Sequence, residues 1–280
     1  MQFRTVVDIP KPDFRIGPRE EMLFVGSCFA DSIGRRFAEE QFRATVNPFG
    51  TMYNPASVLH TIEKYEGQPR IAFLTLGTNH VYRLKETGEI VDNCQKRPAA
   101  LFQEEELSVD QCADYLQRAV DILCSRRPDV HVVVTVSPIR YRKYGYHESQ
   151  LSKATLLLAV DRILNPQFLP SEAGTSKSLI LNSKLVYFPA YEIVMDELRD
   201  YRFYESDMLH PSSQAVEYIW ERLVEHYFSD AARQFLQEWA PLKAALAHRP
   251  FNPDSEEYQQ FMAKTRAKVD ALLNNTKHDL

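Results

Sequence analysis

Short apolar runs that alternate with helical stretches constrain the fold of this chain most. The clearest run is the valine-rich stretch Val130–Val136, and Met22–Val25 and Ile71–Leu76 are comparable. Runs of this length, rich in β-branched residues, are typical of buried strands. Arg43–Val46 and Leu179–Phe188 bring the expected strands to five. Helical patterns long enough for crossovers separate them, so we expect an α/β three-layer sandwich with a five-stranded parallel sheet.

The segments between the strands predict the remaining elements. Helical spacing of apolar residues predicts helices at 29–41, 56–65, 109–125, 148–164, 191–199 and 212–228. Alternation predicts a hairpin over 80–92, followed by a loop over 93–106. Two more helices are predicted at 231–247 and 255–275. We therefore expect one domain over residues 1–230 and a helical C-terminal extension, residues 231–280, packed on it.

Charge and cysteine content exclude several classes of protein. The 280 residues carry a formal net charge of -5, and the Lys and Arg residues are scattered, so no basic surface for nucleic acid is expected. Residues 1–10 lack the pattern of a signal peptide, and no window is apolar enough for a membrane span, which predicts a cytoplasmic protein. The cysteines form no CxxC pair or metal-binding spacing, which favours reduced thiols: Cys28, Cys94, Cys112 and Cys124.

The junction Met22–Asp31 contains the first candidates for chemistry. Four apolar residues end at Gly26, and a helical pattern begins directly afterwards. The amino terminus of a helix leaves backbone N–H groups unpaired and favours negative charge. Ser27 and Cys28 lie at this junction and are the candidate nucleophiles.

A second candidate is the turn that contains Asp207 and His210. A carboxylate three residues before an imidazole can accept a hydrogen bond from one ring nitrogen, while the other nitrogen faces a nucleophile. This arrangement is the one a general base needs. Four residues in other loops could bind substrate or could simply be solvated: His80, Asn93, Arg140 and His147.

Further motifs occur along the chain in a fixed order. They are Gly26–Ala30 (Gly-Ser-Cys-Phe-Ala), Asn47–Pro55, Leu76–Asn79, Asn93–Cys94, Thr135–Pro138, Ser152–Lys153, Tyr187–Glu192, Asp196–Tyr204 and Asp207–Pro211. With these motifs, over about residues 3–228, the chain resembles the GSCFA domain family, within the SGNH (GDSL-like) hydrolase superfamily. The resemblance implies a flavodoxin-like hydrolase fold that needs neither a metal nor an organic cofactor.

The resemblance also implies roles for individual residues. The first block of the superfamily is Gly-Asp-Ser, which places Cys28 at the nucleophilic serine and Ser27 at the aspartate. Either Cys28 is a thiol nucleophile, or Ser27 acts one position earlier, or the acylation chemistry is lost.

The other three blocks supply the remaining groups. Gly50 matches the second block, and Asn79 matches the third, in which His80 replaces an aspartate. The N–H of Gly50, the side-chain amide of Asn79 and the N–H of the nucleophile would form an oxyanion hole. His210 and Asp207 match the fourth block, as base and orienting carboxylate.

The resemblance therefore implies an ester hydrolase that acts on a small-molecule or carbohydrate acyl ester, with an acetyl ester as one candidate. An acyltransferase that uses the same residues remains open. A binding module that retains the fold without turnover is a third alternative, because the first and third blocks are altered. Oligomeric state stays open at this stage.

Overall fold

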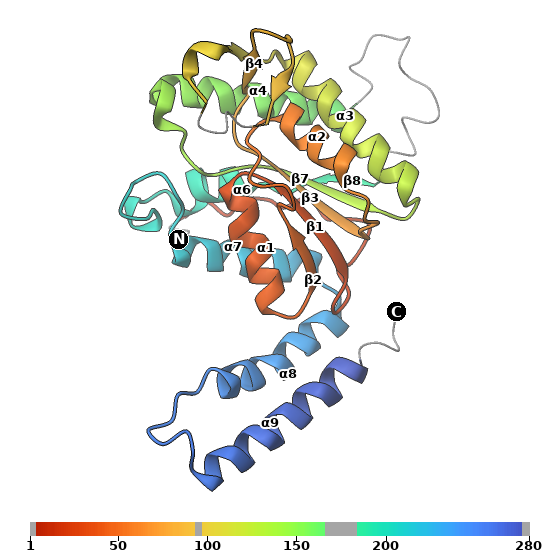
Figure 1. Cartoon of the computed structure of the whole chain (residues 1–280), viewed down its shortest axis with the longest axis vertical. Helices are drawn as coiled ribbons and strands as arrows, with labels where there is room; N and C mark the ends of the chain where they lie inside the picture. The colour runs from red at the N-terminus through yellow and green to blue at the C-terminus, as the bar shows by residue number, and fades with distance from the viewer. Residues whose placement is uncertain (1–3, 93–96, 166–183, 276–280) are drawn as a thin grey trace.

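The computed structural model describes residues 4–92, 97–165 and 184–275 (Figure 1). Its centre is a sheet with the strand order β2-β1-β3-β7-β8, in which every pairing is parallel. The strands are β1 Glu21–Gly26, β2 Arg43–Val46, β3 Ile71–Leu76, β7 His131–Val136 and β8 Leu185–Tyr187. In chain order of the sheet strands this is 2-1-3-4-5, the flavodoxin-like arrangement. The expected five-stranded parallel sheet is therefore confirmed.

Helices cover both faces of this sheet. On one face α2 (Pro55–Lys64), α3 (Val109–Arg126) and α4 (Tyr146–Leu164) share a core with the sheet. On the other face α1 (Cys28–Glu39) and α7 (Ser213–Tyr227) do so. Figure 1 shows these two layers on opposite sides of the strands. This is the three-layer sandwich expected from the alternating pattern.

The two cores differ in composition. Aliphatic side chains such as Leu116 and Val120 of α3 dominate the core under α2, α3 and α4. Rings dominate the other core, where Phe37 of α1 packs against Phe73 and Trp220 with centroids 5.8 and 4.8 Å away. Edge-on and tilted ring pairs of this kind add to the hydrophobic contribution of burial. They fix α1, and with it the junction at its amino terminus, against the sheet.

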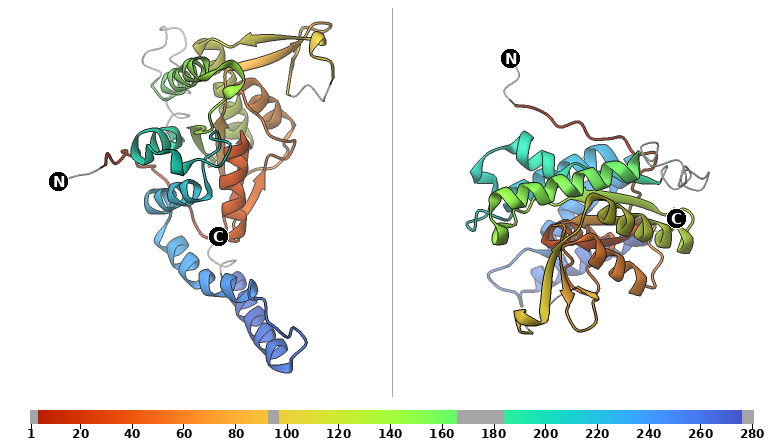
Figure 2. Two further views of the ribbon diagram at one scale, coloured as in Figure 1. Left: turned by 90° about the vertical axis from the view of Figure 1, so that its left-hand side faces the viewer. Right: turned by 90° about the horizontal axis from the view of Figure 1, so that it is seen from above.

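A second, three-stranded sheet extends from the top of the domain (Figure 2). Its strands are β4 His80–Leu84, β5 Ile90–Val91 and β6 Phe102–Glu106, with a short 3-10 helix, η1 Ala99–Leu101, before β6. The prediction of a loop over 93–106 was wrong for β6, which pairs antiparallel with β4. Because Gln103 to Glu106 are polar, β6 lacks apolar alternation, and its long-range pairing leaves no local signal.

The segment after β8 also departs from expectation. The predicted helix over 191–199 is a short α6 (Ala190–Glu192) that continues as a π-helical segment, η4 (Ile193–Leu198). Arg199 ends it with a left-handed φ of 36°. Of the strand predicted over Leu179–Phe188, the structure shows β8, while residues 166–183 lie outside the described part of the chain. Two 3-10 turns lie in other connections, η2 Arg142–Tyr144 between β7 and α4 and η5 Tyr201–Phe203 between η4 and α7.

The C-terminal extension is a helical hairpin of α8 (Asp230–Leu246) and α9 (Glu256–Asn275). It extends away from the sheet at the end opposite the three-stranded sheet (Figures 1 and 2). α8 is held to α1 by Trp239, which is buried and whose indole N–H donates to Glu39 O at 3.1 Å. α9 packs on α8 and also accepts a hydrogen bond from Arg19 at Leu273 O. Within the described ranges, no helix is both long and apolar enough to cross a membrane.

Candidate functional site

The junction between β1 and α1 requires glycine at position 26. Gly26 has φ +145°, and a Cβ at this position would lie 2.0 Å from Thr75 O of the neighbouring strand. The Gly26 N–H donates to Asn47 Oδ1 at 2.9 Å, and the amide nitrogen of Asn47 donates to Asp31 Oδ1. Only a residue without a side chain allows β1 and β3 to approach this closely before α1 begins.

The two candidate nucleophiles differ in their exposure and hydrogen bonding. Ser27 is 2% exposed and is the N-cap of α1, where its Oγ accepts a hydrogen bond from the Phe29 N–H at 3.3 Å. Cys28 is the first residue of α1 and is partly exposed. Its Sγ lies 3.7 Å from the hydroxyl oxygen of Tyr53. The Ser27 hydroxyl is therefore engaged in capping, whereas the Cys28 thiol is accessible.

Tyr53 is a site residue that the sequence analysis missed. Partial desolvation, together with the contact with Cys28, raises the pKa of Tyr53 to about 12. Its backbone carbonyl accepts hydrogen bonds from the N–H groups of Gly77 and Thr78, both at 2.8 Å. Tyr53 lies within the Asn47–Pro55 motif, and this loop position was the only signal in the sequence that could have indicated it.

The expected contact between Asp207 and His210 forms. His210 Nδ1 lies 2.6 Å from Asp207 Oδ2, while Asp207 Oδ1 accepts the N–H groups of Leu209 and His210. These backbone and side-chain hydrogen bonds from His210 hold the pKa of Asp207 at about 2, well below its usual range. With Nδ1 on the carboxylate, Nε2 remains to act on another group.

Arg140 ties this pair to the carboxyl edge of the sheet. Its backbone N–H donates to Leu209 O at 3.0 Å, and its guanidinium donates to Met208 O at 3.2 Å. Arg140 follows the end of β7, a strand that runs parallel to β1 with β3 between them. The turn with Asp207 and His210 therefore lies at the sheet edge where β1 ends and α1 begins. Arg140 positions this turn, a role the sequence alone did not indicate.

The two residues expected to complete an oxyanion hole are engaged in other hydrogen bonds. Gly50 N–H donates to Asn47 O at 2.9 Å. Asn79 Nδ2 donates to Leu107 O at 2.9 Å, and Asn79 is 3% exposed. Asn79 Oδ1 is buried and has no hydrogen-bond partner in the described part of the chain. The single N–H of Gly50 and one of the two hydrogens on Asn79 Nδ2 are therefore engaged with other acceptors in this conformation.

The other expected substrate-binding residues lie in different surroundings. His80 is buried and stacks on Tyr144 with ring centroids 3.9 Å apart, and burial lowers the pKa of His80. His147 is exposed in the first turn of α4. Asn93 lies outside the described residues. The stacking gives His80 a packing role in addition to any contact with substrate.

Lys153 is a second residue whose structural role the sequence did not indicate. It lies on α4, is 2% exposed, and its Nζ donates to Gly77 O and Ser137 O, both at 2.7 Å. Burial lowers the pKa of Lys153 to about 7. The neighbouring Ser152 Oγ accepts the Asn79 N–H at 3.0 Å. Together the two residues connect the segments that follow β3 and β7.

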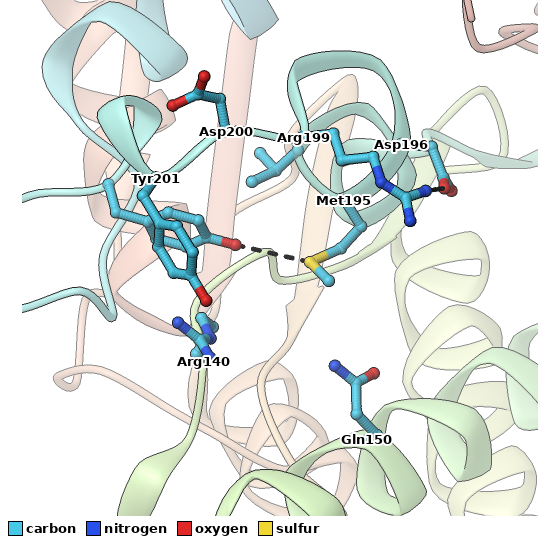
Figure 3. Close-up of a pocket in the computed structure, with 9 residues that line it drawn as sticks. Arg140, Gln150, Met195, Asp196, Arg199, Asp200 and Tyr201 are labelled. Carbon is cyan, nitrogen blue, oxygen red and sulfur yellow. Dashed lines mark hydrogen bonds and ion pairs between the residues drawn. The ribbon is translucent and has the colours of Figure 1, made fainter.

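A cavity of about 410 Å³ lies beside Arg140 (Figure 3). In Figure 3, Arg140 and Gln150 lie on one side of it and Arg199 and Asp200 on the other, with the guanidinium of Arg199 directed towards Asp196. The other lining residues are Val194, Met195, Asp196, Tyr201 and Tyr204. Neither Cys28 nor His210 lines the cavity, which reaches the candidate site only at Arg140.

Comparison with protein-family models matches residues 21–71 and 63–223 to the GSCFA family, and residues 239–279 to the C-terminal domain of GSCFA domain proteins. No curated protein matches the sequence.

Among solved structures, similar folds include a Streptococcus pneumonia protein provisionally described as a platelet activating factor (TM-score 0.46, 13% identity, covering 75% of this chain and 84% of that one). An acetyl esterase mutant with acetate ion has TM-score 0.42 and 11% identity over 79% of this chain and 100% of that one. A carbohydrate esterase family 3 protein from Talaromyces cellulolyticus has TM-score 0.39 and 10% identity, over 78% of this chain and 97% of that one. Because the family match covers most of the chain and includes the Gly-Ser-Cys-Phe-Ala motif at residues 26–30, the chain belongs to the GSCFA family.

Proposed function

We propose that this protein is an SGNH-type ester hydrolase in which Cys28 is the nucleophile, His210 the general base and Asp207 the carboxylate that orients the imidazole. The observation that carries the proposal is the 2.6 Å contact between His210 Nδ1 and Asp207 Oδ2. This contact selects the tautomer in which Nε2 can take a proton. Arg140 supports the proposal, because it fastens this turn to the sheet edge at which α1 begins.

The reaction follows from these groups. His210 Nε2 takes the thiol proton of Cys28, and the sulfur lone pair forms a bond to the acyl carbon. The tetrahedral adduct collapses to a thioester, and the alcohol leaves with the proton from the imidazolium. Water then gives a proton to Nε2 and attacks the thioester, which releases the acid and restores the thiol.

Cys28 is preferred to Ser27 because of their surroundings. A serine that caps a helix loses that hydrogen bond if its oxygen becomes a nucleophile, and it is 2% exposed in this structure. The thiol of Cys28 does not cap the helix. It also opens α1, where unpaired N–H groups favour a developing negative charge.

The substrate we propose is an acyl ester of a small molecule or carbohydrate, with acetyl as the simplest acyl group. The cavity beside Arg140 supports this proposal, since it combines tyrosine rings with amide, carboxylate and guanidinium groups that can bind a polyol. Transfer of the acyl group to an alcohol other than water would use the same residues.

A binding module without turnover is the second candidate. The hydrogen bonds of Gly50 N–H to Asn47 and of Asn79 Nδ2 to Leu107 favour it, because they occupy the Gly50 N–H and one of the two hydrogens of Asn79 Nδ2, the groups that the superfamily uses for the oxyanion. A protein of this kind would bind the ligand without hydrolysing it.

Hydrolysis of acetyl and longer p-nitrophenyl esters by the parent and single variants tests the proposal. We expect activity in the parent, its loss in Cys28→Ala and His210→Ala, and its partial retention in Ser27→Ala. Retained activity in Cys28→Ala with loss in Ser27→Ala would contradict the assignment of the nucleophile. A parent that hydrolyses no ester in the panel while still binding one would favour the binding module.

Alkylation by iodoacetamide gives an independent measure of the thiol. Cys112 is fully buried, and burial raises the pKa of both Cys112 and Cys124, so faster labelling of Cys28 shows only that it is accessible. The informative comparison is Cys28 labelling in the parent and in His210→Ala. Slower labelling in the variant supports a base acting on the thiol, and equal labelling opposes it.

A further inference from the structure

The oxyanion donors expected at Gly50 and Asn79 face other acceptors. Gly50 N–H is 2.9 Å from Asn47 O, and Asn79 Nδ2 is 2.9 Å from Leu107 O inside the protein. An oxyanion is stabilised by donors that already point at its position before the reaction begins. In this conformation the Gly50 N–H is not free for an oxyanion, and one hydrogen of Asn79 Nδ2 is used, so donors close to Cys28 are the first candidates.

Tyr53 presents such a group. Its hydroxyl lies 3.7 Å from Cys28 Sγ, within reach of a hydrogen bond that involves sulfur. When Sγ has attacked a carbonyl, the new oxyanion is two bonds from Sγ, so it can lie beside the sulfur and within hydrogen-bond reach of the phenol. The N–H of Cys28 is a second candidate donor, because an amide in the first helical turn has no intrahelical acceptor.

The backbone holds Tyr53 firmly in this place. Its carbonyl accepts the N–H groups of Gly77 and Thr78, and the preceding Met52 N–H donates to Gly26 O at 2.8 Å. These bonds fasten the Tyr53 segment to the ends of β1 and β3. Such preorganisation lowers the cost of aligning a donor at the moment of reaction.

The phenol also keeps its proton. Desolvation and the neighbouring thiol raise the pKa of Tyr53 to about 12, so it is a hydrogen-bond donor throughout the neutral and mildly alkaline range. A weak acceptor such as a thiol gains little from this donor, whereas an oxyanion gains much.

We propose that the Tyr53 hydroxyl, together with the Cys28 N–H, donates the hydrogen bonds that stabilise the oxyanion, which makes Tyr53 a catalytic residue. The inference rests on the proposed function. As the S–C bond forms, the π electron pair of the carbonyl moves to its oxygen, which accepts the hydrogen bond while Tyr53 retains its proton. Collapse restores the carbonyl, breaks the bond to the alcohol oxygen and returns the phenol to its contact with sulfur.

The test compares Tyr53→Phe with the matched variant Tyr141→Phe, whose ring centroid lies 6.4 Å from that of Tyr53. Tyr53 is 39% exposed, so removal of one hydroxyl should leave the fold intact, which circular dichroism can verify. For p-nitrophenyl acetate we expect kcat to fall about 10²–10³-fold in Tyr53→Phe with KM little changed, and Tyr141→Phe to match the parent. Alkylation of Cys28 by iodoacetamide forms no oxyanion and should continue at close to the parent rate.

Binding of a methyl trifluoromethyl ketone, measured by fluorine NMR, tests the role of Tyr53 without requiring turnover. The ketone forms a tetrahedral adduct with a reactive thiol, and we expect Tyr53→Phe to bind it about 10²-fold more weakly than the parent. Equal affinity and equal kcat in the parent and Tyr53→Phe would overturn the role of Tyr53 but leave the proposed function standing. Equal slowing of alkylation and hydrolysis would also overturn it, because the phenol would then act on the thiol. A parent that neither hydrolyses esters nor forms the adduct would overturn the proposed function and this inference together.

Discussion

Replacement of Lys153 by methionine should change the free energy of unfolding in a way that depends on pH. Methionine retains an apolar chain but removes the ammonium group, which is buried and donates to Gly77 O and Ser137 O. Two hydrogen bonds from a charged group contribute about 1.5–3 kcal/mol each, and the substitution removes both. It also removes the penalty for burying the charge, so the two effects oppose each other.

The pKa supplies the size of that penalty. Burial lowers the pKa of Lys153 from 10.5 to about 7, a difference of about 3.5 units. At about 1.36 kcal/mol per unit this is about 5 kcal/mol below pH 7, comparable with the two hydrogen bonds that are lost. The net change at neutral pH is therefore small compared with either contribution, and its sign does not test the reasoning. The pH dependence does.

Between the lowered pKa and 10.5, the unfolded chain keeps a proton on Lys153 that the folded protein has released. The free energy of unfolding therefore rises with pH in this window. The contribution between about pH 7 and pH 9 amounts to about 2 kcal/mol, and it is absent from Lys153→Met. Most other titrating groups are common to both proteins and cancel in the difference. The phenol of Tyr191, whose ring lies 6.0 Å from Nζ, has a raised pKa and should not titrate in this range.

Equilibrium urea unfolding of parent and variant at pH 7, 8 and 9 measures the effect. We expect the parent to gain about 2 kcal/mol relative to Lys153→Met over this range, with the m-value unchanged. A difference in unfolding free energy that stays constant with pH would refute the reasoning, because it would mean that Lys153 keeps its proton in the folded protein.

Three further variants separate structural from chemical roles. Ser27→Ala should lower the free energy of unfolding by about 1 kcal/mol, through loss of the cap, and a value near zero in urea unfolding would argue against capping. Gly26→Ala should destabilise the protein by about 3 kcal/mol or more, because its Cβ meets Thr75 O at 2.0 Å; an unchanged melting temperature would contradict this. Asp207→Asn should lower kcat about 10²–10⁴-fold with only a small loss of stability, since the carboxylate is exposed. Because the pKa of Asp207 is about 2, this carboxylate should stay ionised over about pH 4 to 9 and add no proton to the acid limb of the parent rate profile, and a two-proton slope there would indicate that Asp207 also titrates.

The predicted elements agree with the structure where the signal is local. The apolar run at Ile71–Leu76 is β3, and the pattern predicted from 109 to 125 is α3, Val109–Arg126. The capping box of Ser108 and Gln111 marks the start of α3, since both side chains bond to backbone amides within four residues. Turn chemistry likewise brought Asp207 and His210 together, because a carboxylate three residues before an imidazole can reach it within one turn.

The candidate site was less fully predictable, because its contacts join distant segments. Tyr53 reaches Cys28 from a loop 25 positions away, and Lys153 reaches Gly77 over 76 positions. Gly50 N–H and Asn79 Nδ2 were expected to face an oxyanion, and in the structure the Gly50 N–H and one hydrogen of Asn79 Nδ2 donate to carbonyl oxygens. A motif specifies which residue types are present, but the direction of a donor depends on the backbone around it.

By itself, the sequence determined the alternation of strands and helices, the parallel sheet and the junction at Cys28, since periodicity, glycine and capping act over a few residues. Only the tertiary structure decided that the polar segment Phe102–Glu106 pairs with β4, that Arg140 holds the turn of His210, and that the hydroxyl of Tyr53 contacts the thiol. The physical reason is that these contacts form when sheet edges and loops from distant parts of the chain converge, and their energies depend on distance and direction in space, for which sequence separation carries no information.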